Sequence, residues 1–174
     1  MSKLIATLLL STLLYATPTP VLTAEPAVAP SPPAADSPEL AAFKKAIRAK
    51  YDMKEKAFAA HDAATIVTKF YAEDARSVGE GYGVFKGRAQ LWPLYEQAVK
   101  ELTVKVTSRY TVVKGDAGWD WADFYVTPVD PAQKPFNLAI LFLWMRDHGE
   151  WMCKGDFYVH GNFEAGTVEK PPAP

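Results

Sequence analysis

An acid, a phenol and an imidazole alternate near the end of the chain, at Asp156, Tyr158 and His160. Side chains two residues apart in an extended strand point to the same face, so this spacing brings the three groups together. A carboxyl group in an apolar cavity has a raised pKa and can move a proton beside a carbonyl or alcohol, while a Tyr or His stabilises the developing charge. Asp156 is therefore the leading candidate for a general acid or base, with Tyr158 and His160 as candidate donors.

The hairpin that ends in this strand allows its cross-strand neighbours to be predicted. A two-residue turn at 148–149 would place Asp147 opposite Glu150. Counting onward, the polar face pairs Leu141 with Asp156, Ala139 with Tyr158 and Asn137 with His160. Leu141 and Asn137 thus become candidate ligand contacts, and the opposite face, with Trp144 and Cys153, is predicted to be core. The polar face could instead be solvated or pack against a second subunit.

A second acid, Asp123, lies among large aromatic residues at alternate positions, namely Trp119, Trp121 and Tyr125. Such a face resembles the wall of a pocket for a flat or hydrophobic molecule, with Asp123 as a further candidate catalytic group. The same pattern is also consistent with an aromatic core.

Two aromatic residues of a helical segment, Trp92 and Tyr95, could close the mouth of the pocket. Aromatic residues at this spacing are also common in helix cores.

The elements that must position these residues are three helices followed by four strands. Ser37, Pro38 and Glu39 are typical of a helix start, and apolar residues then recur at helical spacing to about residue 60. Asp62 is a natural cap for a short second helix whose apolar face includes Ile66, Val67, Phe70 and Tyr71. Glycines punctuate a loop or short-strand region at 79–87, and a third helix follows it.

After residue 101 the hydrophobic period changes to two. This change predicts strands over 102–113, 119–126, 136–146 and 151–160. Consecutive strands with short connections pair antiparallel, so the fold class is α+β, with the helices packed on one curved antiparallel sheet.

The two ends have a different composition from the middle. Residues 1–24 read as a signal peptide, with Lys3 before an apolar stretch that is too short to span a bilayer. Residues 25–38 form a Pro/Ala-rich linker, and 164–174 a disordered tail, which leaves one domain at 39–163. We expect a periplasmic or secreted protein that has no membrane association once the signal is cleaved.

Several classes of function are disfavoured by the composition of the 174 residues. A formal net charge of −1 lacks the basic footprint of a nucleic-acid binder. The three histidines and single cysteine have no metal-ligand spacing, and there is no phosphate loop or dinucleotide fingerprint. We therefore expect neither a metal nor another cofactor.

Three segments resemble the NTF2-like superfamily, in its SnoaL-like, DUF4440 and ketosteroid-isomerase-like branch. They are residues 57–75, with Phe70-Tyr-Ala-Glu-Asp-Ala75 at the end, the segment Val84-Phe-Lys-Gly-Arg-Ala-Gln-Leu91, and Trp151-Met-Cys-Lys-Gly-Asp156. The resemblance implies a cone-shaped cystatin-like fold with an apolar pocket, and a homodimer formed through the outer face of the sheet. Many members have His before the last Asp, where this chain has Gly155, so the implied chemistry is altered here or depends on Asp156 and Tyr158.

The resemblance predicts the fold more closely than the function, because the same fold serves enzymes and binding modules alike. We expect a cofactor-independent isomerase, dehydratase or lyase that uses Asp, Tyr and His on a small hydrophobic or aromatic molecule. The alternative is a non-catalytic ligand-binding or dimerisation module.

Overall fold

The computed structural model describes residues 36–163. The predicted signal peptide, the linker up to residue 35 and the tail at 164–174 lie outside the described residues. Within them, the first helix begins at Pro38, so the last residue of the predicted linker belongs to this helix. No helix in this part of the chain is long and apolar enough to cross a bilayer.

The first two helices begin at the predicted caps. α1 spans Pro38–Ala59, and the Ser37 hydroxyl accepts a hydrogen bond from the Leu40 amide at 3.2 Å. The Asp62 side chain caps the short α2 (Ala63–Thr65), which continues as a π-helical turn, η1 (Ile66–Phe70). α3 spans Gly87–Glu101. The second helix was predicted to include Tyr71, but the chain becomes extended there and Tyr71 begins a strand.

The four predicted strands are all present. They are β3 (Leu102–Lys114), β4 (Ala117–Pro128), β5 (Phe136–Asp147) and β6 (Glu150–His160). Two further strands, β1 (Tyr71–Gly79) and β2 (Gly83–Lys86), precede α3, where a helical face and a loop or short-strand region were expected.

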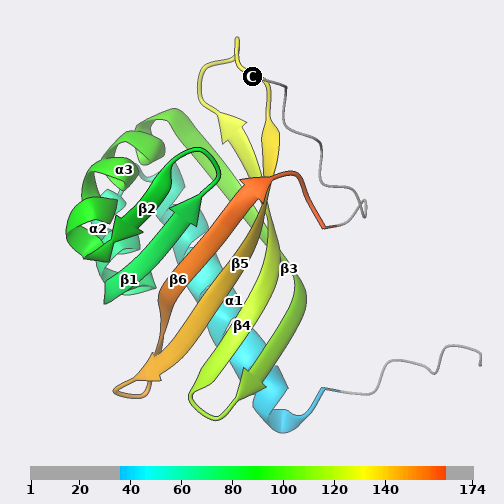
Figure 1. The fold of residues 1–174 in the computed structure, drawn as a ribbon. Helices are drawn as coiled ribbons and strands as arrows, with labels where there is room; N and C mark the ends of the chain where they lie inside the picture. Colours follow the sequence, from blue (N-terminus) through cyan, green and yellow to red (C-terminus); the bar gives the residue numbers. More distant parts are fainter. Residues whose placement is uncertain (1–35, 164–174) are drawn as a thin grey trace, which may run out of the picture. The chain divides into compact units, whose positions relative to one another are not determined.

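The six strands form one sheet in the order β2-β1-β6-β5-β4-β3 (Figure 1). β1 lies parallel to β6, while the other neighbouring pairs are antiparallel. The sheet is therefore mixed rather than antiparallel throughout, because β1 joins β6 from a distant part of the chain and not through a hairpin.

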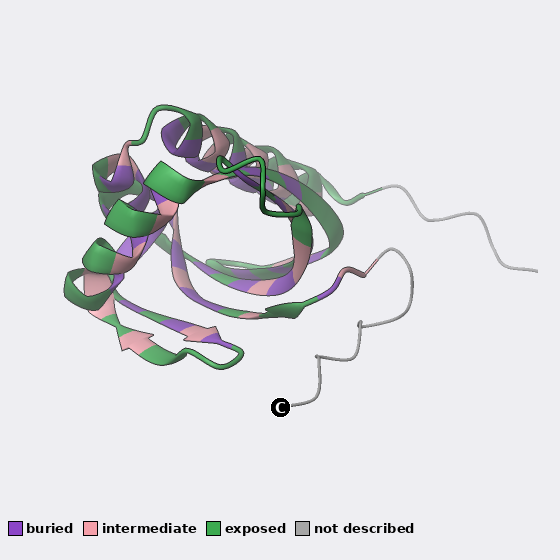
Figure 2. Cartoon of the chain, turned by 90° about the horizontal axis from the view of Figure 1, so that it is seen from above, coloured by how far each residue is buried: buried purple, intermediate pink, exposed green. Residues whose placement is uncertain are grey.

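The sheet curves toward the helices, which cover its concave face (Figure 2). α1 crosses this face and buries Phe43, Ile47 and Tyr51 against it. Aromatic rings fill the core between the layers; the Phe70 and Trp144 centroids, for example, are 5.1 Å apart. The core thus lies between α1 and the sheet, as the helical stripe predicts.

The β5–β6 hairpin begins in the predicted register and then departs from it. His148 and Gly149 both have positive φ, and Asp147 lies opposite Glu150, as expected for a two-residue turn. Trp144 still pairs with Cys153, but Leu143 pairs with Gly155, so Lys154 is the extra residue of a β-bulge.

This bulge changes every later pair, so the predicted partners Leu141, Ala139 and Asn137 are wrong. Asp156 instead lies opposite Phe142, Tyr158 opposite Ile140, and His160 opposite Leu138. Because the bulge inserts one residue, Cys153 and Asp156 both face the helices, although they are three positions apart.

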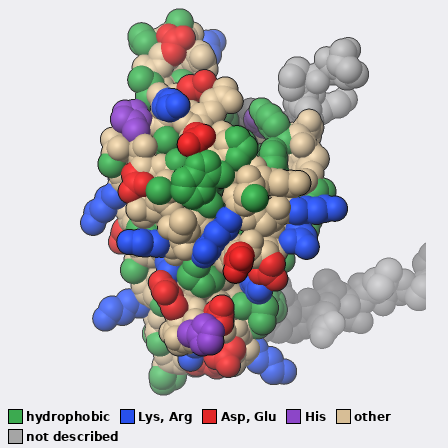
Figure 3. Space-filling model, turned by 90° about the vertical axis from the view of Figure 1, so that its left-hand side faces the viewer, with side chains coloured by type: hydrophobic (Ala, Val, Ile, Leu, Met, Phe, Trp, Pro, Cys, Tyr) green, Lys and Arg blue, Asp and Glu red, His purple; other side chains and the backbone are tan. Residues whose placement is uncertain are grey.

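The face that carries α3, β1 and β2 intersperses acidic and basic side chains (Figure 3). This mixture agrees with the nearly balanced charge of the chain.

Candidate active site

A cavity of about 290 Å³ lies between α1, α3 and the concave face of the sheet. Its walls are mostly aliphatic and aromatic: Phe58, Leu94, Ala98, Leu102, Val104, Phe124, Val126, Leu138 and Ile140. The most exposed lining residues, which mark the mouth, are Tyr82, Gln97, Glu101, Phe136 and His160. This volume is at the small end for ligand sites and suits a molecule of roughly one or two fused rings.

The carboxyl group of Asp156 lies at the floor of this cavity, with only 3% of the residue exposed. Ser77 donates its hydroxyl hydrogen bond to Oδ1 and Tyr71 donates to Oδ2, both at 2.5 Å. An ionised carboxylate has about four lone-pair positions, so each oxygen can still accept a hydrogen bond or a proton from a bound molecule.

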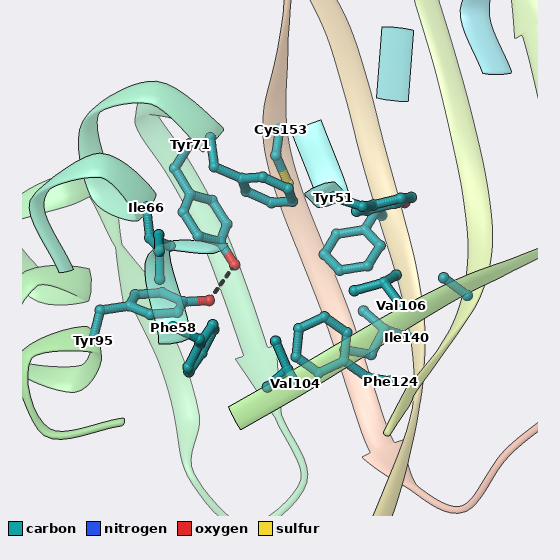
Figure 4. Close-up of a cluster of buried hydrophobic side chains, with 14 of the residues drawn as sticks. Tyr51, Phe58, Ile66, Tyr71, Tyr95, Val104, Val106, Phe124, Ile140 and Cys153 are labelled. Atoms are coloured by element: carbon teal, nitrogen blue, oxygen red, sulfur yellow. Dashed lines mark hydrogen bonds between the residues drawn. The ribbon is translucent and has the colours of Figure 1, made fainter. Parts of the chain in front are cut away.

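Lys54 of α1 provides a positive charge at the same floor and is 2% exposed. Its Nζ donates hydrogen bonds to the Tyr71 and Tyr95 hydroxyls, at 3.1 and 3.0 Å. The two hydroxyls are 2.6 Å from each other, so the phenols connect Lys54 to Asp156. Figure 4 shows Tyr71 and Tyr95 pointing their hydroxyls toward one another. Nζ also lies 4.1 Å from the centroid of the Phe70 ring, close enough for a cation–π contact.

Burial shifts the ionisation of both charged groups toward neutrality. Desolvation raises the pKa of Asp156, although the Lys54 charge and the two hydroxyl donors oppose the rise. Desolvation also lowers the pKa of Lys54 to about 8, and here the Asp156 charge is the main opposing influence. The floor therefore holds an acid and an amine whose pKa values have moved toward each other, a pattern common at functional sites.

Tyr158 and His160 follow Asp156 along the same face of β6 toward the mouth. The Tyr158 ring is half-buried, and desolvation followed by the Asp156 charge raises its pKa to about 12. Its hydroxyl has no hydrogen-bond partner among residues 36–163, so it is available to a ligand. Nδ1 of the exposed His160 is 3.5 Å from Oε2 of Glu80. The alternation within β6 thus brings the three predicted residues to one cavity wall.

The aromatic residues around Asp123 lie outside the cavity. Trp119 and Trp121 are more than one-third exposed, whereas the residues between and beyond them, such as Asp120 and Phe124, face the helices. Asp123 is fully buried, but Nε of Arg109 is 2.6 Å from its Oδ2 and the Phe163 amide is 2.7 Å from its Oδ1.

These contacts correct the predicted pocket wall. Alternation along β4 puts Trp119, Trp121, Asp123 and Tyr125 on the outer face of the sheet, and none of them lines the cavity. Leu141 and Asn137 also lie outside the lining, since Phe142 and Leu138 take the inward positions of β5.

Of the two candidate aromatic residues of α3, one lies in the cavity and one does not. Tyr95 is buried at the floor rather than at the mouth, whereas Trp92 is exposed and donates from Nε1 to Glu96. Tyr95 lines the cavity and Trp92 does not.

Three floor residues are absent from the sequence-derived candidates. Lys54 could have been found from the sequence, because it is the one charged residue on an otherwise uncharged helical stripe. The stripe consists of Phe43, Ile47, Tyr51, Lys54 and Phe58. Tyr71 and Ser77 had no such signal, since their positions depend on β1, whose parallel pairing with β6 is a tertiary contact.

The described residues include no group of three or more His, Cys, Asp or Glu side chains that could hold a metal ion. The polar groups of the cavity are suited to proton transfer and hydrogen bonding.

Comparison with solved structures identifies the fold of this chain. No family model matches the chain and no curated protein matches its sequence. Solved structures do match, including an NTF2-like protein of unknown function from Pseudomonas putida KT2440 with a TM-score of 0.62 and 16% identity, covering 77% of this chain and 98% of that one.

A second match is an NTF2-like protein with a cystatin-like fold from Novosphingobium aromaticivorans, with a TM-score of 0.62, 16% identity and coverage of 73% and 87% of the two chains. This chain has the NTF2-like fold. A ketosteroid isomerase-like protein from Erwinia carotovora atroseptica SCRI1043 matches with a TM-score of 0.58 and 18% identity, over 72% of this chain and 98% of that one. The NTF2-like fold is compatible with an isomerase or with a ligand-binding protein, so the role of this chain must be argued from its cavity.

Proposed function

We propose that this protein is a cofactor-independent acid–base enzyme, an isomerase, dehydratase or lyase, for a small hydrophobic or aromatic molecule. Asp156 is the base that takes a proton from the bound molecule, and the Tyr158 hydroxyl donates a hydrogen bond to the oxygen on which charge develops. The observation that carries the proposal is the Asp156 carboxyl group, almost fully buried at the floor of an apolar cavity.

The surroundings of Asp156 support this assignment. Ser77 and Tyr71 hold the carboxylate in place from one side, which keeps its remaining lone pairs in a constant position. Tyr158 lies two residues along the same strand face, so one small molecule can contact both groups. His160 stands at the mouth, where it can contact a polar substituent of the molecule.

The test uses 2-tetralone, an aromatic ketone of two fused rings with acidic C1 protons. We expect the full chain to accelerate exchange of these protons with D₂O, followed by ¹H NMR. Asp156→Asn should reduce the acceleration at least about 100-fold, and Tyr158→Phe about tenfold or more. Asp123→Asn is the matched control, since it neutralises another buried acid that lies outside the cavity, and it should retain the activity.

The proposed enzyme activity would be contradicted by exchange of the C1 protons that is no faster with the wild type than with Asp156→Asn. If 2-tetralone nevertheless binds under those conditions, shown by quenching of tryptophan fluorescence or by chemical-shift changes, the cavity belongs to a ligand-binding module.

We also propose that the protein is exported and forms a homodimer. Export is supported by the composition of residues 1–24. The dimer is supported by apolar side chains on the outer face of the sheet, where Trp121, Leu141 and Phe157 occupy paired positions on three neighbouring strands. Phe157 is 50% exposed and Trp121 37% exposed in the single chain.

A further inference from the structure

Lys54 has a position that proton abstraction by Asp156 does not require. Its amine lies at the floor of a mostly apolar cavity, where an uncharged hydrophobic residue would fit the helical stripe better. The rings of Phe70, Tyr71 and Tyr95 surround it, with centroids between 4.1 and 5.1 Å from Nζ. Among the described residues its hydrogen-bond partners are two phenols, and no carboxylate contacts Nζ directly.

A lysine amine becomes a nucleophile toward carbonyl carbon when it loses its proton, and desolvation in an apolar site favours that loss. The hydrogen-bonded phenols also give Lys54 a route for the proton, from Nζ through the Tyr71 hydroxyl to Asp156 Oδ2. A ligand that enters the cavity from the mouth reaches Lys54 and Asp156 at the same floor.

We propose that Lys54 captures an aldehyde or ketone as a covalent imine, so that the substrate class of this cavity is a small aromatic or hydrophobic carbonyl compound. This inference rests on the proposed function for the location of the substrate and extends it to a covalent intermediate.

The step balances without any further reactant. The Lys54 ammonium first gives one proton to the Asp156 carboxylate through Tyr71. The Nζ lone pair then forms a bond to the carbonyl carbon, the π pair moves to oxygen, and a proton passes from nitrogen to that oxygen. Asp156 next returns its proton to the hydroxyl, the C–O bond breaks, and water leaves as the nitrogen lone pair forms the C=N bond. The net reaction converts ammonium and carbonyl to iminium and water, with Asp156 again a carboxylate.

The iminium also explains why an acid and an amine share one floor. A positively charged C=N group draws electrons from the neighbouring C–H bond more strongly than a carbonyl does, so the regenerated Asp156 carboxylate can remove that proton more easily.

The experiment traps the adduct in the full-length protein. The protein is incubated with 2-tetralone and sodium cyanoborohydride, which delivers hydride to an iminium carbon and leaves a secondary amine. We expect a mass gain equal to that of 2-tetralone less one oxygen atom, mapped by peptide mass spectrometry to Lys54. Modification there should be at least about tenfold faster than at solvent-exposed lysines, which are almost fully protonated near neutral pH.

Variants provide matched controls. Lys54→Met, which replaces the amine with an unbranched apolar side chain one atom shorter, should lose the adduct, while Lys56→Arg, at an exposed position of the same helix, should retain it. Asp156→Asn should slow the trapping because no acid remains to protonate the hydroxyl that leaves as water. The wild-type digest decides the question even if a variant fails to fold: modification spread over surface lysines with none at Lys54 overturns the inference.

The inference and the proposed function fail in different ways. If Lys54→Met still exchanges the C1 protons and the wild type gives no adduct, Asp156 works without an imine and only the inference is overturned. If the adduct forms on Lys54 but the C1 protons are not exchanged, the covalent capture stands and the acid–base enzyme does not.

Discussion

At the scale of single residues, Lys54 and Asp156 set each other's ionisation. The two groups are buried at the same floor and joined through the Tyr71 hydroxyl. Burial disfavours the charge on each group, so it raises the pKa of Asp156 and lowers the pKa of Lys54. The opposite charge of the partner partly restores ionisation in each, so removal of one group must shift the pKa of the other.

The first prediction follows for Asp156. Lys54→Met removes the positive charge that opposes the effect of burial, and the already raised pKa of Asp156 should rise further. A ¹³C NMR titration of the carboxyl carbon would measure this shift. Lys56→Met, on the exposed side of the helix, should leave the titration unchanged, and a lower or equal pKa in Lys54→Met would show that the two groups are not coupled.

The second prediction concerns the pH dependence of stability. Burial lowers the Lys54 pKa from 10.5 to about 8, so between these two values the unfolded chain binds more protons at this site than the folded chain does. The contribution of Lys54 to the free energy of unfolding should therefore rise as pH increases from about 8 to about 10.5, by an amount on the order of 3 kcal/mol.

Urea unfolding of the wild type and Lys54→Met across this range would test the second prediction. The difference in stability between the two proteins should move in favour of the wild type as pH rises. A difference that stays constant would mean that the amine titrates normally in the folded protein.

At the scale of elements, the site depends on the way β6 meets its two neighbours. The Lys154 bulge turns Asp156, Tyr158 and His160 toward the helices, and the parallel strand β1 supplies Tyr71 and Ser77 from the other side. Gly79 of β1 lies opposite Tyr158, and a Cβ atom at Gly79 would fall 2.2 Å from the Tyr158 ring. The ring therefore occupies the space that the missing side chain leaves.

The third prediction follows from this contact. Gly79→Ala should displace Tyr158 from its position, destabilise the domain by about 1–3 kcal/mol through overpacking, and lower 2-tetralone exchange about as much as Tyr158→Phe does. Gly115→Asn is a suitable control, because the position has φ +60°, which Asn tolerates, and has open space around it. The contact with Tyr158 would be unimportant if Gly79→Ala matched the wild type in both stability and exchange.

At the scale of the whole molecule, the two faces of the sheet have different roles. The concave face encloses the cavity with α1 and α3, and the outer face carries an apolar patch formed by Trp119, Trp121, Leu143, Phe157 and Val159. Apolar side chains that gather in a contiguous patch are typical of an interaction surface.

The fourth prediction is that this patch joins two copies of the chain. We expect sedimentation velocity at micromolar concentration to show a dimer for the wild type and a monomer for Phe157→Lys, because a charge buried in the interface has no partner. Val84→Lys, an exposed position on β2, should remain dimeric. A monomeric wild type would refute the dimer and leave the apolar patch on the outer face without an explanation.

The sequence by itself determined the elements whose hydrophobic pattern is local. α1 and its Ser37 cap, α3 and the four later strands could be predicted, because a helical or alternating period is written into consecutive residues. The same local rule placed Asp156, Tyr158 and His160 on one face of β6, since alternation within a strand does not depend on its neighbours.

Only the tertiary structure decided that these three residues of β6 face the helices, and which side chains surround them. The Lys154 bulge shifted the partners of Asp156 by one residue, and no local pattern marked it. The parallel pairing of β1 with β6 brought Tyr71 and Ser77 to the carboxylate from about 80 residues away in the chain, a contact that depends on the whole fold. Lys54 lies between these cases: its place on the apolar stripe is visible in the sequence, but its partners come from α3 and β1, which only folding brings together.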